Sequence, residues 1–119
     1  MKRNRVGFNY AIRGIFTALQ TEYNMKIHFV VMFVTLFAGL YFQLSVFEWL
    51  FVLIAIGFVL AFELMNTAIE LVTNQLFPGQ HEDAKRIKDI SAASVLIAAV
   101  FAAIVGTIIF APKVINLIS

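Results

Sequence analysis

The sequence predicts an all-α integral membrane protein with three transmembrane helices and an N-terminal amphipathic helix at the interface. Three observations support this fold class. Of the 119 residues, 61% are hydrophobic and only 13% are charged, against about 25% charged in a typical soluble domain. The mean hydropathy is +0.90. Three apolar stretches also reach the roughly 20 residues that a spanning helix needs.

The first 26 residues differ from the rest of the chain in carrying regularly spaced basic and polar side chains. Arg5, Asn9, Arg13 and Thr17 recur at every fourth position, which places them on one face of a helix. Apolar residues cover much of the other side: Phe8, Ile12, Ile15, Phe16 and Leu19. We expect segment 1–26 to be a basic amphipathic helix in the membrane interface, for which simple anchoring is the alternative role.

The three apolar stretches predict the three transmembrane helices of a single domain, 1–119. The predicted spans are residues 27–46, 49–77 and 90–111. Only the short segment QLSVFE separates the first two spans, so these spans should form an antiparallel hairpin. Pro78 and Gly79 end the second span, and we expect the charged segment 78–89 to be a loop.

Lysine and arginine side chains are distributed unevenly between the two sides of the predicted bundle. Five of them precede the first span and three precede the third, while Lys113 alone follows the third. The positive-inside rule therefore predicts that the N-terminus and the 78–89 loop are cytoplasmic, in a multi-pass protein of the plasma (inner) membrane. The basic residues are too few and too close to the membrane to indicate nucleic-acid binding.

The second span contains polar residues at membrane depth, in the run FVLAFELMNTAIELV. Counted from Trp49 at the outer boundary, Glu63 lies roughly 21 Å and Glu70 roughly 31 Å along the helix. The hydrocarbon core is about 30 Å thick. Glu63 and Glu70 differ by only about 20° around the helix, and Asn66 and Thr67 flank them. The four side chains predict a polar track from the cytoplasm into the bilayer.

A carboxylate at this depth costs about 2.5–3.5 kcal/mol and is a functional candidate by default. Buried Glu63 suits a general base. Glu70, at headgroup level, suits a ligand of Mg²⁺, which usually takes one or two carboxylates plus phosphate oxygens. Glu22 is a second candidate ligand, although a solvated charge at a helix end is the simpler interpretation. For Asn66, hydrogen bonding between packed helices is the structural alternative.

The charged loop supplies groups that suit a nucleotide, although such loops are usually only solvated surface. Lys88 and Asp89 directly precede the third span, where a Lys can meet a phosphate and an Asp a metal or a ribose. His81 can hydrogen-bond a base edge. There is no His/Cys cluster that would indicate zinc. Neither G-x-x-x-x-G-K-[ST] nor G-x-G-x-x-G is present, so nucleotide binding would use neither a P-loop nor a Rossmann turn.

Three segments of the chain together resemble the prokaryotic membrane diacylglycerol kinase family. They are RGIFTALQTEYNMKIH before the first span, FELMNTAIELV in the second, and HEDAKRIKD followed by SAASV. The resemblance implies a small three-span lipid kinase, typically a homotrimer with active sites shared between neighbouring subunits. It also implies transfer of the γ-phosphate of ATP to a lipid hydroxyl, using Mg²⁺.

By matching positions, the resemblance implies a role for each site residue. Glu63 is similar to the general base, Asn66 to a residue that orients the substrate or the base, and Glu70 and Glu22 to the metal ligands. The implied nucleotide contacts are Arg3, Tyr10, Gly79, Gln80, His81, Lys88 and Asp89. One position departs from the family pattern: Asn74 stands where members usually have Asp. This departure weakens ATP·Mg²⁺ binding or is compensated by Asp83 or Asp89.

The compact motifs are more similar to undecaprenol kinases than to diacylglycerol kinases, so undecaprenol is the expected substrate and diacylglycerol the alternative. Because of Asn74, a weakened or inactive homologue is a further alternative. Two other classes of protein compete with the kinase. A transporter would use the carboxylates as a proton relay, but the outer half of the second span is almost wholly apolar. A non-catalytic assembly protein would use them as contacts between helices.

Overall fold

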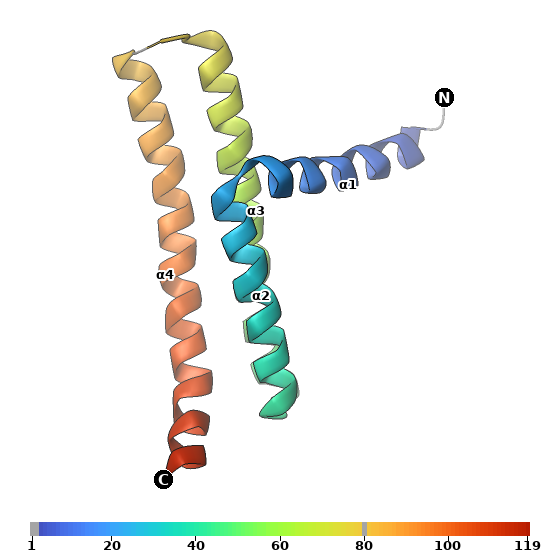
Figure 1. The fold of residues 1–119 in the computed structure, drawn as a ribbon, viewed down its shortest axis with the longest axis vertical. Coiled ribbons are helices and arrows are strands. Elements are labelled where there is room, and N and C mark those ends of the chain that lie inside the picture. The colour runs from blue at the N-terminus through green and yellow to red at the C-terminus, as the bar shows by residue number, and fades with distance from the viewer. Residues whose placement is uncertain (1–2, 80) are drawn as a thin grey trace.

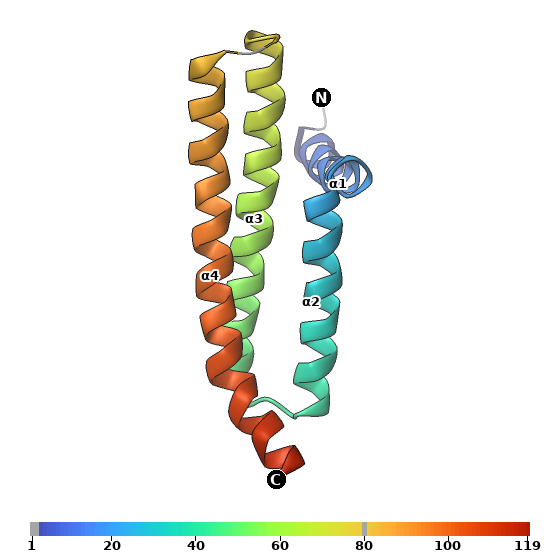
Figure 2. The ribbon, with the colours of Figure 1, turned by 60° about the vertical axis from the view of Figure 1, so that its left-hand side comes forward.

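Four helices make up the computed structural model, which describes residues 3–79 and 81–119, with the backbone alone in 3–6. They are α1 (Arg3–Thr21), α2 (Tyr23–Tyr41), α3 (Val46–Leu76) and α4 (Glu82–Ile118). Helices α2, α3 and α4 run side by side, and α1 projects sideways from them (Figures 1 and 2). These three are long and apolar enough to cross a membrane. The prediction of an all-helical protein with three candidate spans is confirmed.

Helix α4 starts earlier than the sequence predicted, and eight of the twelve residues of the expected 78–89 loop are helical. The helix begins at Glu82, and its first turns carry ion pairs between side chains one turn apart. Lys85 Nζ lies 2.7 Å from Asp89 Oδ2, and Arg86 Nη2 lies 3.7 Å from Glu82 Oε1. Such i,i+4 pairs stabilise a helix. The acidic side chains in the first turn also interact favourably with the positive, N-terminal end of the helix dipole.

The connection between α2 and α3 is a short turn, 42–45, that ends in a capping box. The Glu48 backbone N–H donates to Ser45 Oγ at 3.2 Å, and the Ser45 N–H donates to Glu48 Oε1 at 2.9 Å. Two otherwise unpaired backbone donors are thereby satisfied at the start of α3. Lys113 Nζ lies 3.1 Å from Glu48 Oε2, which ties the far part of α4 to this hairpin. We call this end of the bundle the hairpin end.

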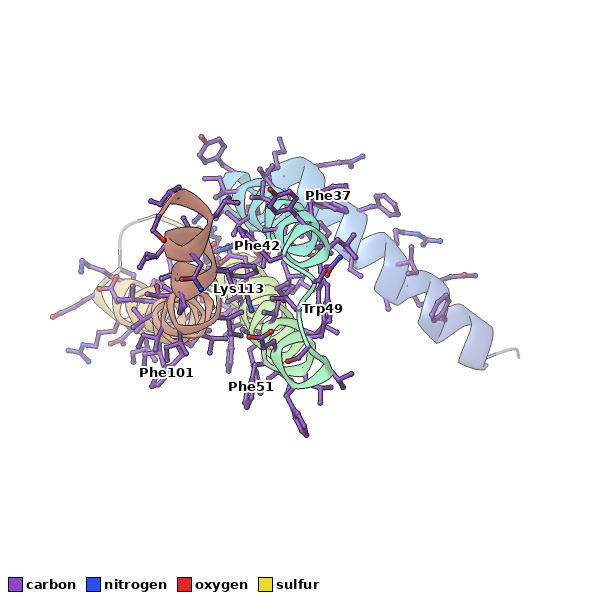
Figure 3. The ribbon with its side chains drawn as sticks, turned by 90° about the horizontal axis from the view of Figure 1, so that it is seen from below. Phe37, Phe42, Trp49, Phe51, Phe101 and Lys113 are labelled. Atoms are coloured by element: carbon purple, nitrogen blue, oxygen red, sulfur yellow. The ribbon has the colours of Figure 1, made fainter. Side chains whose placement is uncertain are left out.

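A small cluster of buried apolar residues lies at the hairpin end. Leu44, Val52 and Ile109 form a buried cluster, against which Phe42 and Trp49 pack. In the view from this end, Phe42, Trp49 and Lys113 are gathered where the helices meet, whereas other large side chains point outward (Figure 3). Most large apolar side chains of the three spans are exposed. An apolar exterior of this kind suits contact with lipid or with other membrane helices.

The junction of α1 and α2 is a packed elbow part-way along α3. Glu22 separates the two helices with an extended backbone, φ −112° and ψ 118°. On either side of it, Ala18 and Met25 are buried, the latter completely. Helices α3 and α4 continue beyond this elbow to their own connection at 77–81, which we call the loop end (Figures 1 and 2). The packed elbow therefore fixes the position of Glu22 at the start of α2.

Candidate active site

The polar track predicted on α3 is buried against the neighbouring helices. Glu63 is only 2% exposed, and Asn66 and Thr67 are also buried. Their i, i+3 and i+4 spacing places them on one helix face. Thr67 Oγ1 donates to the Glu63 backbone carbonyl at 3.0 Å, so this hydroxyl is satisfied within its own helix. Glu63 and Asn66 thus carry the polar groups that are available to a partner.

Within the described part of the chain, three buried oxygens have no hydrogen-bond partner. They are Glu63 Oε1 and Asn66 Oδ1 on α3, and Ser91 Oγ on α4. Buried polar atoms are rarely left without partners in folded proteins. Because Glu63 Oε1 and Asn66 Oδ1 are acceptors, a donor such as a hydroxyl would satisfy either. Glu63 Oε1 and Asn66 Oδ1, one turn apart on α3, are therefore acceptors that remain available to a polar ligand.

A histidine that the sequence analysis did not single out meets Glu63 from the adjacent helix. His28, on α2, places Nε2 at 3.6 Å from Glu63 Oε2, and its side chain is 22% exposed. The signal in the sequence was a polar residue just inside the first predicted span, at the end of TEYNMKIH. Which polar side chain of the second span it faces depends on how α2 and α3 pack, and spacing along one chain does not contain that information.

The two predicted metal ligands lie between Glu63 and the loop end. Glu70 is half-buried on α3, two turns from Glu63 along the helix. Glu22 is half-buried at the elbow, and its side chain makes no capping hydrogen bond to α2. Among the described residues no three His, Cys, Asp or Glu side chains form a metal cluster. Two carboxylates nevertheless fit Mg²⁺, which usually completes its coordination with phosphate oxygens and water.

A cavity of about 600 Å³ at the loop end brings together most of the predicted nucleotide contacts. It is lined by Gly79, His81, Glu82, Ala84, Lys85, Lys88 and Asp89. Gly79 has φ 87°, a left-handed conformation that glycine adopts without strain. Four of the seven contacts that the family resemblance implied thus line one cavity.

The side chains around this cavity are not equally available to a ligand. His81 Nδ1 accepts a hydrogen bond from the Asp83 backbone N–H at 3.1 Å and thereby caps α4. Asp89 is bound to Lys85 at 2.7 Å. Lys88 is half-buried, and no described carboxylate lies within ion-pair distance of it. Lys88 is therefore the cation of this cavity best placed to meet a phosphate.

The remaining predicted contacts are not part of this cavity in a single chain. Tyr10 is exposed on α1, and the Arg13 guanidinium lies 5.3 Å from the centroid of its ring. Helix α1 projects away from the bundle at the elbow, while the cavity lies further along α3 and α4 (Figures 1 and 2). The side chain of Arg3 and all of Gln80 lie outside the described residues.

Comparison with known proteins decides between the classes of protein that this geometry permits. The family model described as "Prokaryotic diacylglycerol kinase" matches residues 9–110, which is most of the chain. The chain belongs to the prokaryotic diacylglycerol kinase family. The resemblance seen in the sequence motifs is confirmed, and the protein is a membrane lipid kinase. Membership of a kinase family also implies ATP as the phosphate donor.

Two relatives of this kinase have different named substrates. It is 37% identical over 106 residues to the undecaprenol kinase of Bacillus subtilis (strain 168), covering 89% of this chain and 86% of that protein. It is 35% identical over 114 residues to a diacylglycerol kinase of Synechocystis sp.. That match covers 94% of this chain but only 65% of the longer relative. Both comparisons support the lipid kinase, and they differ on the lipid.

Proposed function

We propose that this kinase transfers the γ-phosphate of ATP to the hydroxyl of undecaprenol, with Mg²⁺, at the cytoplasmic side of the membrane. The observation that carries the proposal is the Glu63 carboxylate, 2% exposed within a candidate spanning helix and with one oxygen unpartnered. A hydroxyl carried by a lipid can reach such a carboxylate from within the bilayer. A base for a water-soluble alcohol would not need this position.

The arrangement supports a direct transfer mechanism. The lipid hydroxyl donates a hydrogen bond to Glu63 Oε1, and Glu63 takes the proton as the hydroxyl oxygen attacks the γ-phosphorus. A new bond forms between that oxygen and phosphorus, and the bond from phosphorus to the β-phosphate oxygen breaks, releasing ADP. Asn66, one turn from Glu63, orients the hydroxyl. Phosphoryl transfer depends mainly on such positioning and on neutralisation of phosphate charge.

The charge of ATP would be neutralised between the polar track and the loop end. Lys88, half-buried in the loop-end cavity, would bind phosphate oxygens. Glu70 and Glu22 would hold Mg²⁺, because carboxylates are the hard oxygen ligands that it prefers. The bound ion would offset the negative charge of the phosphates. The lipid would thus reach Glu63 from the membrane and ATP from the loop end.

An apolar cavity lined by His28, the residue that meets Glu63, would provide space for the hydrocarbon part of the substrate. Its volume is about 410 Å³, and it extends from His28 and Val59 to Phe110 between α2, α3 and α4. Its lining is almost entirely apolar, with Thr35 among the few polar side chains. One elongated cavity lined by His28 fits one polyprenyl chain more readily than two acyl chains. This shape favours undecaprenol, as does the nearly full-length match to the undecaprenol kinase.

We further propose that the active kinase is a homotrimer with shared sites, oriented with its N-terminus and loop end in the cytoplasm. Helix α1 projects away from its own bundle (Figure 1), and Tyr10 on it is 60% exposed. A neighbouring subunit would bring this helix, and with it Tyr10 and Arg3, to the loop-end cavity. The proposed orientation in the membrane rests on the excess of Lys and Arg near the N-terminus and the loop end.

A substrate competition experiment tests this function. Purified kinase in lipid nanodiscs would receive γ-labelled ATP, Mg²⁺ and equal amounts of undecaprenol and diacylglycerol. We expect most of the label in undecaprenyl phosphate, because the apolar cavity lined by His28 suits a single chain. Most of the label in phosphatidic acid would establish the alternative substrate instead. No labelled lipid at all, from protein that unfolds cooperatively on heating, would contradict the kinase activity of this chain.

A further inference from the structure

We propose that His28 is a positioning residue for Glu63, the proposed catalytic base, and this inference rests on the proposed function. His28 Nε2 holds one carboxylate oxygen, Oε2, across the interface between α2 and α3. The other oxygen, Oε1, is then the one presented to the lipid hydroxyl. The kinase would thus use a side chain from the first span to aim a base on the second.

The contact between His28 and Glu63 is within ion-pair distance but longer than a hydrogen bond. The distance from His28 Nε2 to Glu63 Oε2 is 3.6 Å, longer than the roughly 2.9 Å of a formed N–H···O bond. Catalytic hydrogen bonds are often long before substrate binds and tighten in the reactive complex. Imidazole donates from Nε2 both when charged and in its Nε2–H tautomer. The proposed role therefore needs only the N–H donor at Nε2.

The surroundings of Glu63 explain why a partner is needed. The base must be ionised to accept a proton, and an ionised carboxylate in an apolar surrounding is very costly unless it is paired. Among the described residues, His28 is the one basic side chain within ion-pair distance of Glu63. Thr67 gives its hydroxyl to a backbone carbonyl. The donor for the Glu63 side chain thus comes from α2 and not from its own helix.

The position of His28 also directs the carboxylate toward the proposed substrate. His28 lines the apolar cavity of about 410 Å³ that runs along the bundle. Its side chain is 22% exposed, whereas that of Glu63 is 2% exposed. With Oε2 held by a residue at the cavity wall, rotation of the carboxylate would be restricted, and we expect Oε1 to meet a hydroxyl that enters from this cavity. Removing His28 should therefore slow chemistry without removing the binding site for ATP.

Three variants and one control test this inference, with lipid phosphorylation as the readout. For His28→Ala we expect kcat to fall at least tenfold, with KM for ATP within about twofold of wild type. His28→Gln should recover most of kcat, because the Gln amide nitrogen takes the place of Nε2 and donates to Oε2. In a Glu63→Gln background, His28→Ala should cause no further loss. The control Thr107→Val changes an exposed hydroxyl bonded to the Ala103 carbonyl and should behave as wild type.

Each contrary result overturns a defined part of the account. Wild-type kcat in His28→Ala, or a folded His28→Gln variant with kcat more than tenfold below wild type, would overturn the role of His28. An equal fractional loss from His28→Ala with and without Glu63 would show that His28 acts elsewhere. If His28→Ala does not fold, as judged by thermal unfolding, His28→Gln decides alone. Failure of the proposed function would look different, because wild-type protein itself would phosphorylate no lipid.

Discussion

Glu63→Gln is expected to lower kcat for lipid phosphorylation by about 10²- to 10⁴-fold, the range typical of losing a general base. Gln has the shape of Glu but cannot take the proton from the lipid hydroxyl. Because Glu63 is 2% exposed and lies away from the loop-end cavity, KM for ATP should change little. Initial rates in nanodiscs at saturating undecaprenol, with ATP varied, would separate the two constants.

A matched control for this variant lies near the other end of the same helix. Glu48→Gln makes the same chemical change in the capping box of α3, where Gln can replace Glu. Wild-type kcat is expected for this control. A Glu63→Gln variant that folds and keeps more than a tenth of wild-type kcat would contradict the assignment of Glu63 as the base.

Glu70→Gln is expected to raise the Mg²⁺ concentration for half-maximal activity by at least tenfold. The substitution removes one hard anionic ligand, and the affinity of a site for Mg²⁺ depends on its carboxylates. Glu22→Gln should shift the Mg²⁺ dependence in the same direction, since Glu22 is the second proposed ligand. The measurement is a Mg²⁺ titration of lipid phosphorylation at fixed ATP, with Glu48→Gln as the control.

The Mg²⁺ titration separates a metal ligand from a base. A ligand variant should regain much of its activity at high Mg²⁺, whereas Glu63→Gln should stay slow at every concentration. An unchanged half-maximal Mg²⁺ concentration in Glu70→Gln, together with a low kcat, would show that Glu70 acts on the transfer step and not on the metal.

The structure also bears on whether the polar track only joins helices. In that role the polar side chains should bond to one another across the interface. Glu63 Oε2 does meet His28 across the α2–α3 interface. However, Glu63 Oε1 and Asn66 Oδ1 have no partner among the described residues, and Thr67 bonds within its own helix. Together with the family membership, this arrangement favours catalysis over assembly.

The helical architecture was predictable because hydropathy identifies long apolar segments without any tertiary information. The start of α4 was not, since Glu82 to Asp89 was interpreted as a solvated loop when only its charge was considered. The helix was nevertheless encoded in the spacing of those charges, as the contacts of Lys85 with Asp89 and of Arg86 with Glu82 show. Charge content and charge spacing thus favoured different structures, and the spacing matched the helix that the structure contains.

The site was partly predictable for the same reason. Glu63 and Asn66 could be placed on one buried face from helical period alone, and Lys88, Asp89, His81 and Gly79 line one cavity because they are close in sequence. The contact of His28 with Glu63 depends on how α2 packs on α3, which no single-helix pattern contains. A contact with a neighbouring subunit, as proposed for Tyr10, cannot be derived from the fold of one chain.

Asn74 is the position where this kinase departs from the family pattern. It is exposed on α3, one turn beyond Glu70. Asp83 and Asp89, the carboxylates considered as substitutes for the missing charge, are both ion-paired, with Arg86 at 3.6 Å and with Lys85 at 2.7 Å. Both carboxylates are therefore already ion-paired. Neither of them supplies an unpaired negative charge in place of the Asp that is usual in the family.

The central claim is that the base lies where a lipid hydroxyl, and not water, can reach it. The most direct test is to follow the γ-phosphate of labelled ATP in nanodiscs with and without undecaprenol. With undecaprenol present, we expect the label almost entirely in lipid phosphate. Without it, we expect inorganic phosphate to be released at least tenfold more slowly than lipid phosphate forms when undecaprenol is present. Release of inorganic phosphate without the lipid at a rate close to that of lipid phosphorylation would contradict the central claim.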